Sequence, residues 1–189
     1  MIKVALAVIA LAAPFAMAQT STWTIDPAHS QVDFTVRRLE LTDVQGRFGR
    51  VTGDLDLNEA DVTKSKMQMT IDLTGLDSKD DVRDEHLKSD AFFEVSVFPT
   101  AKFVSNSVAR NGAGLTVNGL LTLHGFTKPV TLHVDAPRHS RGTDKKLHTS
   151  YRATTTITRS AFAVGDAYPE AAISDAVNLT IELETVKKR

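Results

Sequence analysis

The fold is decided by residues 115–134, which read LTVNGLLTLHGFTKPVTLHV. From Leu115 to Leu123 every second residue is apolar, apart from one glycine, and the same alternation returns from Val130 to Val134. A period of two is typical of a strand with one buried and one solvated face. Residues 125–129 between the two runs contain the glycine and proline that favour a turn. The stretch therefore predicts two antiparallel strands joined by a short connection.

The same pattern recurs along the chain. The other predicted strands cover residues 32–36, 51–57, 67–73, 101–108, 147–158 and 179–183. Threonine, whose β-branched side chain suits a pleated strand, occurs 22 times, always after residue 18. The separators are short and turn-like, which favours antiparallel neighbours, because parallel strands need long crossover connections. Only residues 80–89 are predicted to form a helix, with Ser78 or Asp80 as its cap.

The predicted fold class is all-β, an eight-stranded antiparallel barrel with one short helical segment. A sandwich would also bury the apolar faces, but a closed barrel removes the exposed strand edges that promote aggregation. An eight-stranded barrel is just wide enough to be filled by side chains or to hold one slender ligand. The alternation does not distinguish a filled barrel from a hollow one.

Composition bounds the function. The chain of 189 residues suits one domain, and its net charge of −1 provides no basic excess for binding nucleic acid. It contains no cysteine, which excludes disulfides, thiolate metal sites and a cysteine nucleophile.

Residues 1–18 are predicted to be a signal peptide, leaving residues 19–189 as the folded domain. Lys3 precedes an apolar run, Val4–Ala13, and residues 16–18 read Ala-Met-Ala, which predicts cleavage after Ala18. The rival interpretation is a membrane anchor, but ten apolar residues are too few to cross a hydrocarbon core of about 30 Å. We therefore expect an exported, periplasmic protein without a stable membrane anchor.

No motif for catalysis, a metal or a cofactor emerges. Neighbouring residues on an extended chain point apart, so His29 and Ser30 are expected to form a turn rather than a base and its nucleophile. None of the six histidines forms a His-x-x-x-His pair. The acidic residues between Asp77 and Glu85 lack the spacing of a calcium loop and suit the start of a helix.

Four ordered motifs resemble the YceI-like, polyisoprenoid-binding family. They are residues 23–34 (WTIDPAHSQVDF), 81–93 (DVRDEHLKSDAFF), 119–130 (GLLTLHGFTKPV) and 173–177 (ISDAV). The resemblance implies a lipocalin-like barrel in an exported bacterial protein, a hydrophobic tunnel for a long isoprenoid chain, no enzymatic activity, no cofactor and often a homodimer. Two segments depart from the family pattern, Arg37–Leu41, which follows the predicted strand 32–36 at the place of the family's second strand, and Arg159–Ala163, where alanine replaces a glycine.

The apolar residues on the alternating faces are the candidate tunnel lining, although the pattern alone favours an ordinary filled core. Two neighbouring methionines on one face are typical of an adaptable wall. Arg83 and His86 are candidates for contact with a lipid head group, or for hydrogen bonds between helix and barrel. The candidate lining residues are Phe34, Val36, Met67, Met69, Ile71, Phe92, Phe103, Leu121, Leu123, Phe126 and Leu132.

The first functional hypothesis is an exported carrier or reservoir for a polyisoprenoid or similar long amphiphilic lipid. A module for another amphiphile, such as a fatty acid, is the second. The third is a lipid-ester hydrolase that uses His29, His86 or Ser30. The fourth is a filled barrel that acts through its surface in a stress response.

Overall fold

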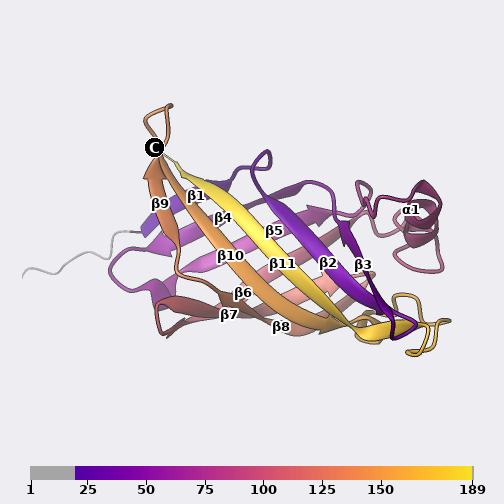
Figure 1. The fold of residues 1–189 in the computed structure, drawn as a ribbon. Coiled ribbons are helices and arrows are strands. Elements are labelled where there is room, and N and C mark those ends of the chain that lie inside the picture. The colour runs from indigo at the N-terminus through magenta and orange to yellow at the C-terminus, as the bar shows by residue number, and fades with distance from the viewer. Residues whose placement is uncertain (1–19, 189) are drawn as a thin grey trace, which may run out of the picture.

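The structure is a computed structural model that describes residues 20–188, so the predicted signal peptide lies outside the described residues. It is an elongated barrel with the helix α1 (Asp81–Lys88) at one end and the C-terminus at the other (Figure 1). Two short 3-10 helices, η1 (Val62–Lys64) and η2 (Arg159–Phe162), lie between strands. The strands are β1 (Thr20–Ile25), β2 (Gln31–Arg38), β3 (Thr42–Arg47), β4 (Val51–Asn58), β5 (Lys66–Asp72), β6 (Thr100–Asn111), β7 (Gly114–Leu123), β8 (Phe126–Val134), β9 (Arg138–Arg141), β10 (Leu147–Thr158) and β11 (Ile173–Lys187).

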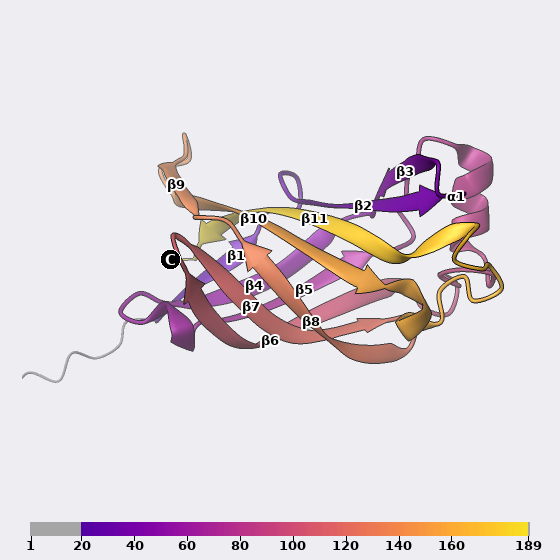
Figure 2. The ribbon, with the colours of Figure 1, turned by 60° about the horizontal axis from the view of Figure 1, so that its bottom comes forward.

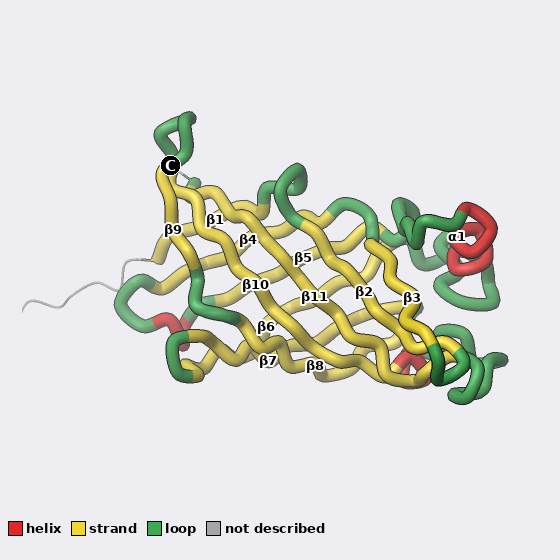
Figure 3. Tube along the Cα trace, in the orientation of Figure 1, coloured by secondary structure: helices red, strands yellow, loops and turns green. Residues whose placement is uncertain are grey.

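The sheet closes on itself as an eight-stranded antiparallel barrel. Hydrogen-bonded neighbours run β11–β1–β4–β5–β6–β7–β8–β10, and the pairing of β10 with β11 completes the circuit. Figure 2 and Figure 3 show the tilted strands wrapping around the interior. The predicted fold class is confirmed, because each of these pairs is antiparallel and closure leaves few exposed edges.

All eight predicted strands are present, but the closed circuit does not consist of the same eight. β1 belongs to the circuit and was not predicted, because Trp23 and Ile25 are its only large apolar residues. Its third buried position is Ser21, whose hydroxyl accepts a hydrogen bond from the Trp23 indole at 2.9 Å. β2 lies outside the circuit and pairs with residues 173–182 of β11 on one side and with β3 on the other. β9 pairs with β10.

The helix begins as the sequence predicted. The Asp80 carboxylate caps it by accepting a hydrogen bond from the backbone N–H of Arg83 at 3.0 Å. Ser78, the other predicted cap, instead donates its hydroxyl hydrogen to Asp84, which is the buried residue of the helix. This pair fastens α1 to the loop that leads out of the barrel. No helix within residues 20–188 has the length and apolar character needed to cross a membrane.

The inner faces of the strands form one apolar core. Gly119, on the inner face of β7, provides space for an aromatic ring, because a Cβ atom there would lie 2.4 Å from the ring of Phe103. The Phe103 side chain, from β6, is 1% exposed and lies across that space. The interior is therefore packed at mid-barrel, and its hollow parts lie towards the two ends.

Candidate functional site

The larger interior cavity lies at the α1 end of the barrel and has a volume of about 230 Å³. Strands supply apolar side chains that alternate inward, and α1 with its following turn closes the cavity from outside. Such a space, apolar with a few polar groups at one end, is the usual form of a small-molecule site. The apolar residues that line it are Val32, Phe34, Val36, Val44, Phe48, Ile71, Leu73, Leu87, Phe92, Phe93, Ala101, Leu121, Leu123, Ile157, Val164, Ile173, Val177 and Leu179.

Polar side chains are gathered where this cavity reaches the surface. Arg38 continues the inward-facing series of β2 beyond Val36 and is exposed at the mouth. The His86 imidazole shares a hydrogen bond of 2.7 Å with the Tyr168 hydroxyl. The Tyr168 ring stacks on Phe92 with 5.0 Å between the ring centroids. The mouth therefore combines a cation with an aromatic cluster.

Arg83 has a largely structural set of contacts. Its Nε donates to the Ser78 hydroxyl at 2.8 Å, and its Nη2 donates to the Ser78 carbonyl at 2.6 Å. Its Nη1 lies 3.9 Å from the carboxylate of Asp80. The guanidinium lines the mouth, but most of its donors already have partners.

Arg159 is a buried cation, only 6% exposed, in the wall of the same cavity. Its guanidinium donates five hydrogen bonds to backbone carbonyls, those of Val164, Gly165, Tyr168, Ile173 and Ser174, at 2.6–3.2 Å. These bonds hold the loop between η2 and β11 against the barrel. Buried carbonyls need such donors, because an unpaired polar group in the interior is costly.

Both segments that we expect to depart from the family pattern, residues 37–41 and 159–163, lie at this mouth. Arg38 precedes a tight turn in which Leu39 and Glu40 have φ values of 50° and 57°, in the left-handed region. Ala163 follows η2 with a φ of 53°, in the conformation that glycine adopts at lowest cost. Both segments therefore lie at the rim of the cavity, outside the closed circuit of strands.

A second, smaller cavity of about 60 Å³ lies towards the other end of the barrel. It is lined mainly by apolar residues from β4, β5, β6, β7, β8, β10 and β11, among them Met67, Val117, Leu132 and Ile181. Tyr151 also lines it, and burial raises the pKa of its hydroxyl to about 12. The tyrosine is therefore neutral at physiological pH.

The two cavities have no lining residue in common, so packed side chains separate them. Along β5, Met67 lines the smaller cavity and Ile71 the larger one, while Met69 between them lines neither. Met69 is 2% exposed and lies opposite Phe103 in the β5–β6 register. We call Met69 and Phe103 the partition.

The candidate site residues fall into four groups. Phe34, Val36, Ile71, Phe92, Leu121 and Leu123 line the larger cavity, together with Arg83 and His86. Met67 and Leu132 line the smaller cavity. Met69 and Phe103 form the partition. Phe126 is 45% exposed at the start of β8, at the rim of the barrel, and lines neither cavity, so we leave it out of the proposed site.

Sequence reasoning missed several residues of the mouth. Extending the alternation of β2 by one step from Val36 would have included Arg38. No local signal pointed to Tyr168 or Arg159, because the first lies in an irregular loop and the second in a 3-10 turn. Both reach the cavity through folding of the segment before β11.

His29 and Ser30 do not form a nucleophile and its base. The His29 Nδ1 lies 2.9 Å from the carboxylate of Asp26. The Ser30 hydroxyl accepts a hydrogen bond from the backbone N–H of Glu184 at 3.0 Å and donates to the carbonyl of the same residue. The turn predicted for these residues is what the structure contains.

The family model described as YceI-like domain matches residues 23–185. The chain belongs to the YceI-like family. A UPF0312 protein of Vibrio parahaemolyticus is 32% identical over 183 residues, which cover 95% of this chain and 94% of the relative. A UPF0312 protein of Shewanella denitrificans is 39% identical over 127 residues, 67% of this chain and 64% of the relative.

Solved structures share the barrel. A YCEI protein of Campylobacter jejuni aligns with a TM-score of 0.72 and 25% identity, covering 79% of this YceI-like chain and 88% of that one. BcnA of Burkholderia cenocepacia aligns with a TM-score of 0.75 and 24% identity, and the alignment covers 85% of this chain and 98% of BcnA. A polyisoprenoid binding domain from Saccharophagus degradans aligns with a TM-score of 0.62 and 19% identity, and the alignment covers 88% of this chain and 98% of that domain. The latter two show the shared fold alone.

Proposed function

We propose that this YceI-like protein is an exported carrier or reservoir for a polyisoprenoid or a similar long amphiphilic lipid. The observation that carries the proposal is the apolar cavity of about 230 Å³ inside the barrel, with its polar groups at the mouth. The name of the Saccharophagus degradans domain adds support for an isoprenoid ligand. The lipid tail would lie in the cavity and its head group at Arg38, His86 and Tyr168.

The energetics favour such a ligand. Each methylene-sized group removed from water contributes about 0.8 kcal/mol. Several isoprene units therefore supply enough free energy to exceed the cost of association, without any charged contact to the tail. The head-group contacts would then determine orientation and selectivity.

The mouth favours an anionic head group. Arg38, Arg83, Arg159 and His86 line the larger cavity, whereas no Asp or Glu does so within residues 20–188. The guanidinium of Arg159 and most N–H donors of Arg83 already form hydrogen bonds to the protein. Arg38 is therefore the cation best placed to contact a ligand.

We predict that Arg38→Gln weakens binding of a prenyl phosphate about three- to tenfold, as expected for loss of one partly solvated charged contact. Binding of the prenyl alcohol of equal length should change little. Arg37→Gln is the matched control, because Arg37 faces outward and pairs with Asp43 at 2.9 Å. Affinities measured by fluorescence competition would decide, and equal losses for phosphate and alcohol would contradict the assignment.

Leu121→Trp should abolish lipid uptake, because Leu121 is 6% exposed and the larger side chain would fill the cavity that it lines. Leu120→Trp is the control, because the adjacent residue on β7 faces outward and is 45% exposed. The measurement is the amount of fluorescent prenyl probe bound at saturation. Full uptake by Leu121→Trp would argue against binding in this cavity.

Mass spectrometry of the organic extract of purified protein tests the function directly. We expect a lipid with a long apolar chain in about stoichiometric amount from the parent protein and little from Leu121→Trp. Protein that neither carries a lipid nor binds prenyl compounds would refute the proposal. The intact mass of the exported protein tests the localisation, because it should correspond to a chain that begins at Gln19.

A further inference from the structure

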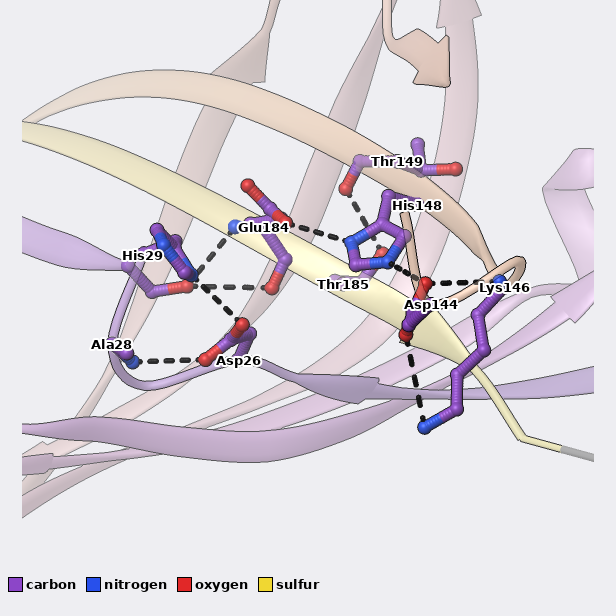
Figure 4. A network of polar contacts seen from close by, with 10 residues as sticks. Asp26, Ala28, His29, Asp144, Lys146, His148, Thr149, Glu184 and Thr185 are labelled. Atoms are coloured by element: carbon purple, nitrogen blue, oxygen red, sulfur yellow. Dashed lines mark hydrogen bonds and ion pairs between the residues drawn. The ribbon is translucent and has the colours of Figure 1, made fainter. Parts of the chain in front are cut away.

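Five side chains of types that ligate metal ions gather around β11, beside β10 and the turn between β1 and β2 (Figure 4). Asp26 and His29 come from the turn between β1 and β2, and Glu184 from β11. His148, from β10, and Asp144, from the turn before it, lie on the other side of Glu184. None of the five lines either interior cavity.

Three of these residues converge on one point. The ligating atoms of Asp26, His29 and Glu184 all lie within 4.8 Å of one another. Asp26 Oδ2 and His29 Nδ1 are 2.9 Å apart. Two ligands of a tetrahedral zinc ion, each about 2.0–2.1 Å from the metal, are about 3.3 Å apart. Small rotations of these partly exposed side chains would bring all three into coordination.

The backbone beneath this cluster is held firmly. The backbone N–H of Asp26 donates to the carbonyl of Glu184 at 2.8 Å, and the Ser30 hydroxyl bonds to both backbone groups of Glu184. The Asp26 Oδ1 accepts a hydrogen bond from the Ala28 N–H at 2.9 Å, which leaves Oδ2 directed at His29. The side chains are therefore presented from fixed positions, as a metal site requires.

His148 and Asp144 form an outer layer. The His148 Nδ1 lies 2.7 Å from Glu184 Oε1, and its Nε2 lies 3.1 Å from Asp144 Oδ1. Gly142 makes room for this pair, because a Cβ atom there would lie 2.6 Å from His148 Nε2. Hydrogen bonds of this kind orient the ligands of metal sites from outside.

We infer that Asp26, His29 and Glu184 bind one divalent transition-metal ion such as Zn²⁺, with water completing the coordination, and that His148 positions Glu184. An imidazole with two carboxylates suits zinc and related ions, whereas Mg²⁺ prefers oxygen ligands and water. The spacing of the histidines in the sequence did not predict a metal site, because Glu184 is remote from Asp26 and His29 in the chain. The inference is independent of the proposed lipid site, because none of these residues lines the larger cavity.

Titration of untagged, delipidated protein with ZnCl₂ in a calorimeter tests the inference. We expect one Zn²⁺ per chain, and no competition from Mg²⁺. His29→Gln and Glu184→Gln should each weaken Zn²⁺ binding by at least about tenfold, and His148→Gln by about tenfold through loss of the orienting bond. His133→Gln is the control, because His133 is exposed on β8 and belongs to no such cluster.

Two further readouts separate binding from folding. His29 is 65% exposed, so His29→Gln should leave the melting temperature of the metal-free protein unchanged. In NMR spectra, Zn²⁺ should shift the ring signals of His29 and leave those of His133 in place. Absence of Zn²⁺ binding by the parent protein, or parental affinity in His29→Gln, would overturn the inference.

Discussion

Phe103→Ala is expected to join the two cavities and to shift lipid binding towards longer chains. Phe103 and Met69 lie between the larger cavity and the smaller one and line neither, and the Phe103 ring occupies the space beside Gly119. In the parent protein, the gain in affinity per isoprene unit should cease once the tail reaches the partition. In Phe103→Ala it should continue, so that the longest chains bind at least about tenfold more tightly than to the parent.

The measurement is a series of prenyl alcohols of increasing length, bound to each variant. Removing a buried aromatic side chain costs about 3–5 kcal/mol of stability, so Met69→Ala serves as a second variant that opens the partition from the other strand. Phe126→Ala is the control, because it removes an exposed ring that lines neither cavity. Identical dependence on chain length in the parent protein and both partition variants would contradict the prediction. Failure of the parent protein to bind any prenyl chain would instead contradict the proposed function.

Arg159→Met is expected to cause the largest loss of stability of any arginine substitution in the barrel. The change keeps most of the apolar stem but removes the donors of five hydrogen bonds to backbone carbonyls. Leaving buried carbonyls unpaired should lower the free energy of unfolding by about 3–5 kcal/mol. For a domain of this size the melting temperature should fall by roughly 10 °C.

Arg152→Met is the matched control for this change. Arg152 lies on the outer face of β10, with a side chain 57% exposed and 3.7 Å from Glu182, and its loss should change stability by at most about 0.5 kcal/mol. Hydrogen exchange adds a local readout, because backbone amides between residues 163 and 173 should exchange faster in Arg159→Met. Parental melting and exchange in that variant would show that the loop is held by other contacts.

Arg159 and Arg38 illustrate how far sequence reasoning reached. Arg38 continues the alternation of β2, so the local pattern contains the information that it faces inward. Arg159 has no such pattern, and its burial depends on carbonyls supplied by the loop before β11. The same distinction separates Leu121, which was predicted to face inward and does, from Tyr168, which no periodicity indicates.

The proposed metal site and the partition depend on contacts between distant parts of the chain. Asp26 and His29 meet Glu184 only because β1 and β2 both flank β11. Met69 lies opposite Phe103 because of the β5–β6 register, and Gly119 on the next strand leaves space for the ring. None of these distances follows from spacing along the sequence.

The sequence by itself determined eight of the strands, their inward faces, the position of the helix and its Asp80 cap, because each depends on periodicity or on neighbours within a few residues. Only the tertiary structure decided that the barrel is packed at mid-length and hollow towards its ends. It also decided which cations reach the mouth. The physical reason is that closure of the sheet sets the register between strands, and register determines which side chains share a layer and whether their volumes fill it.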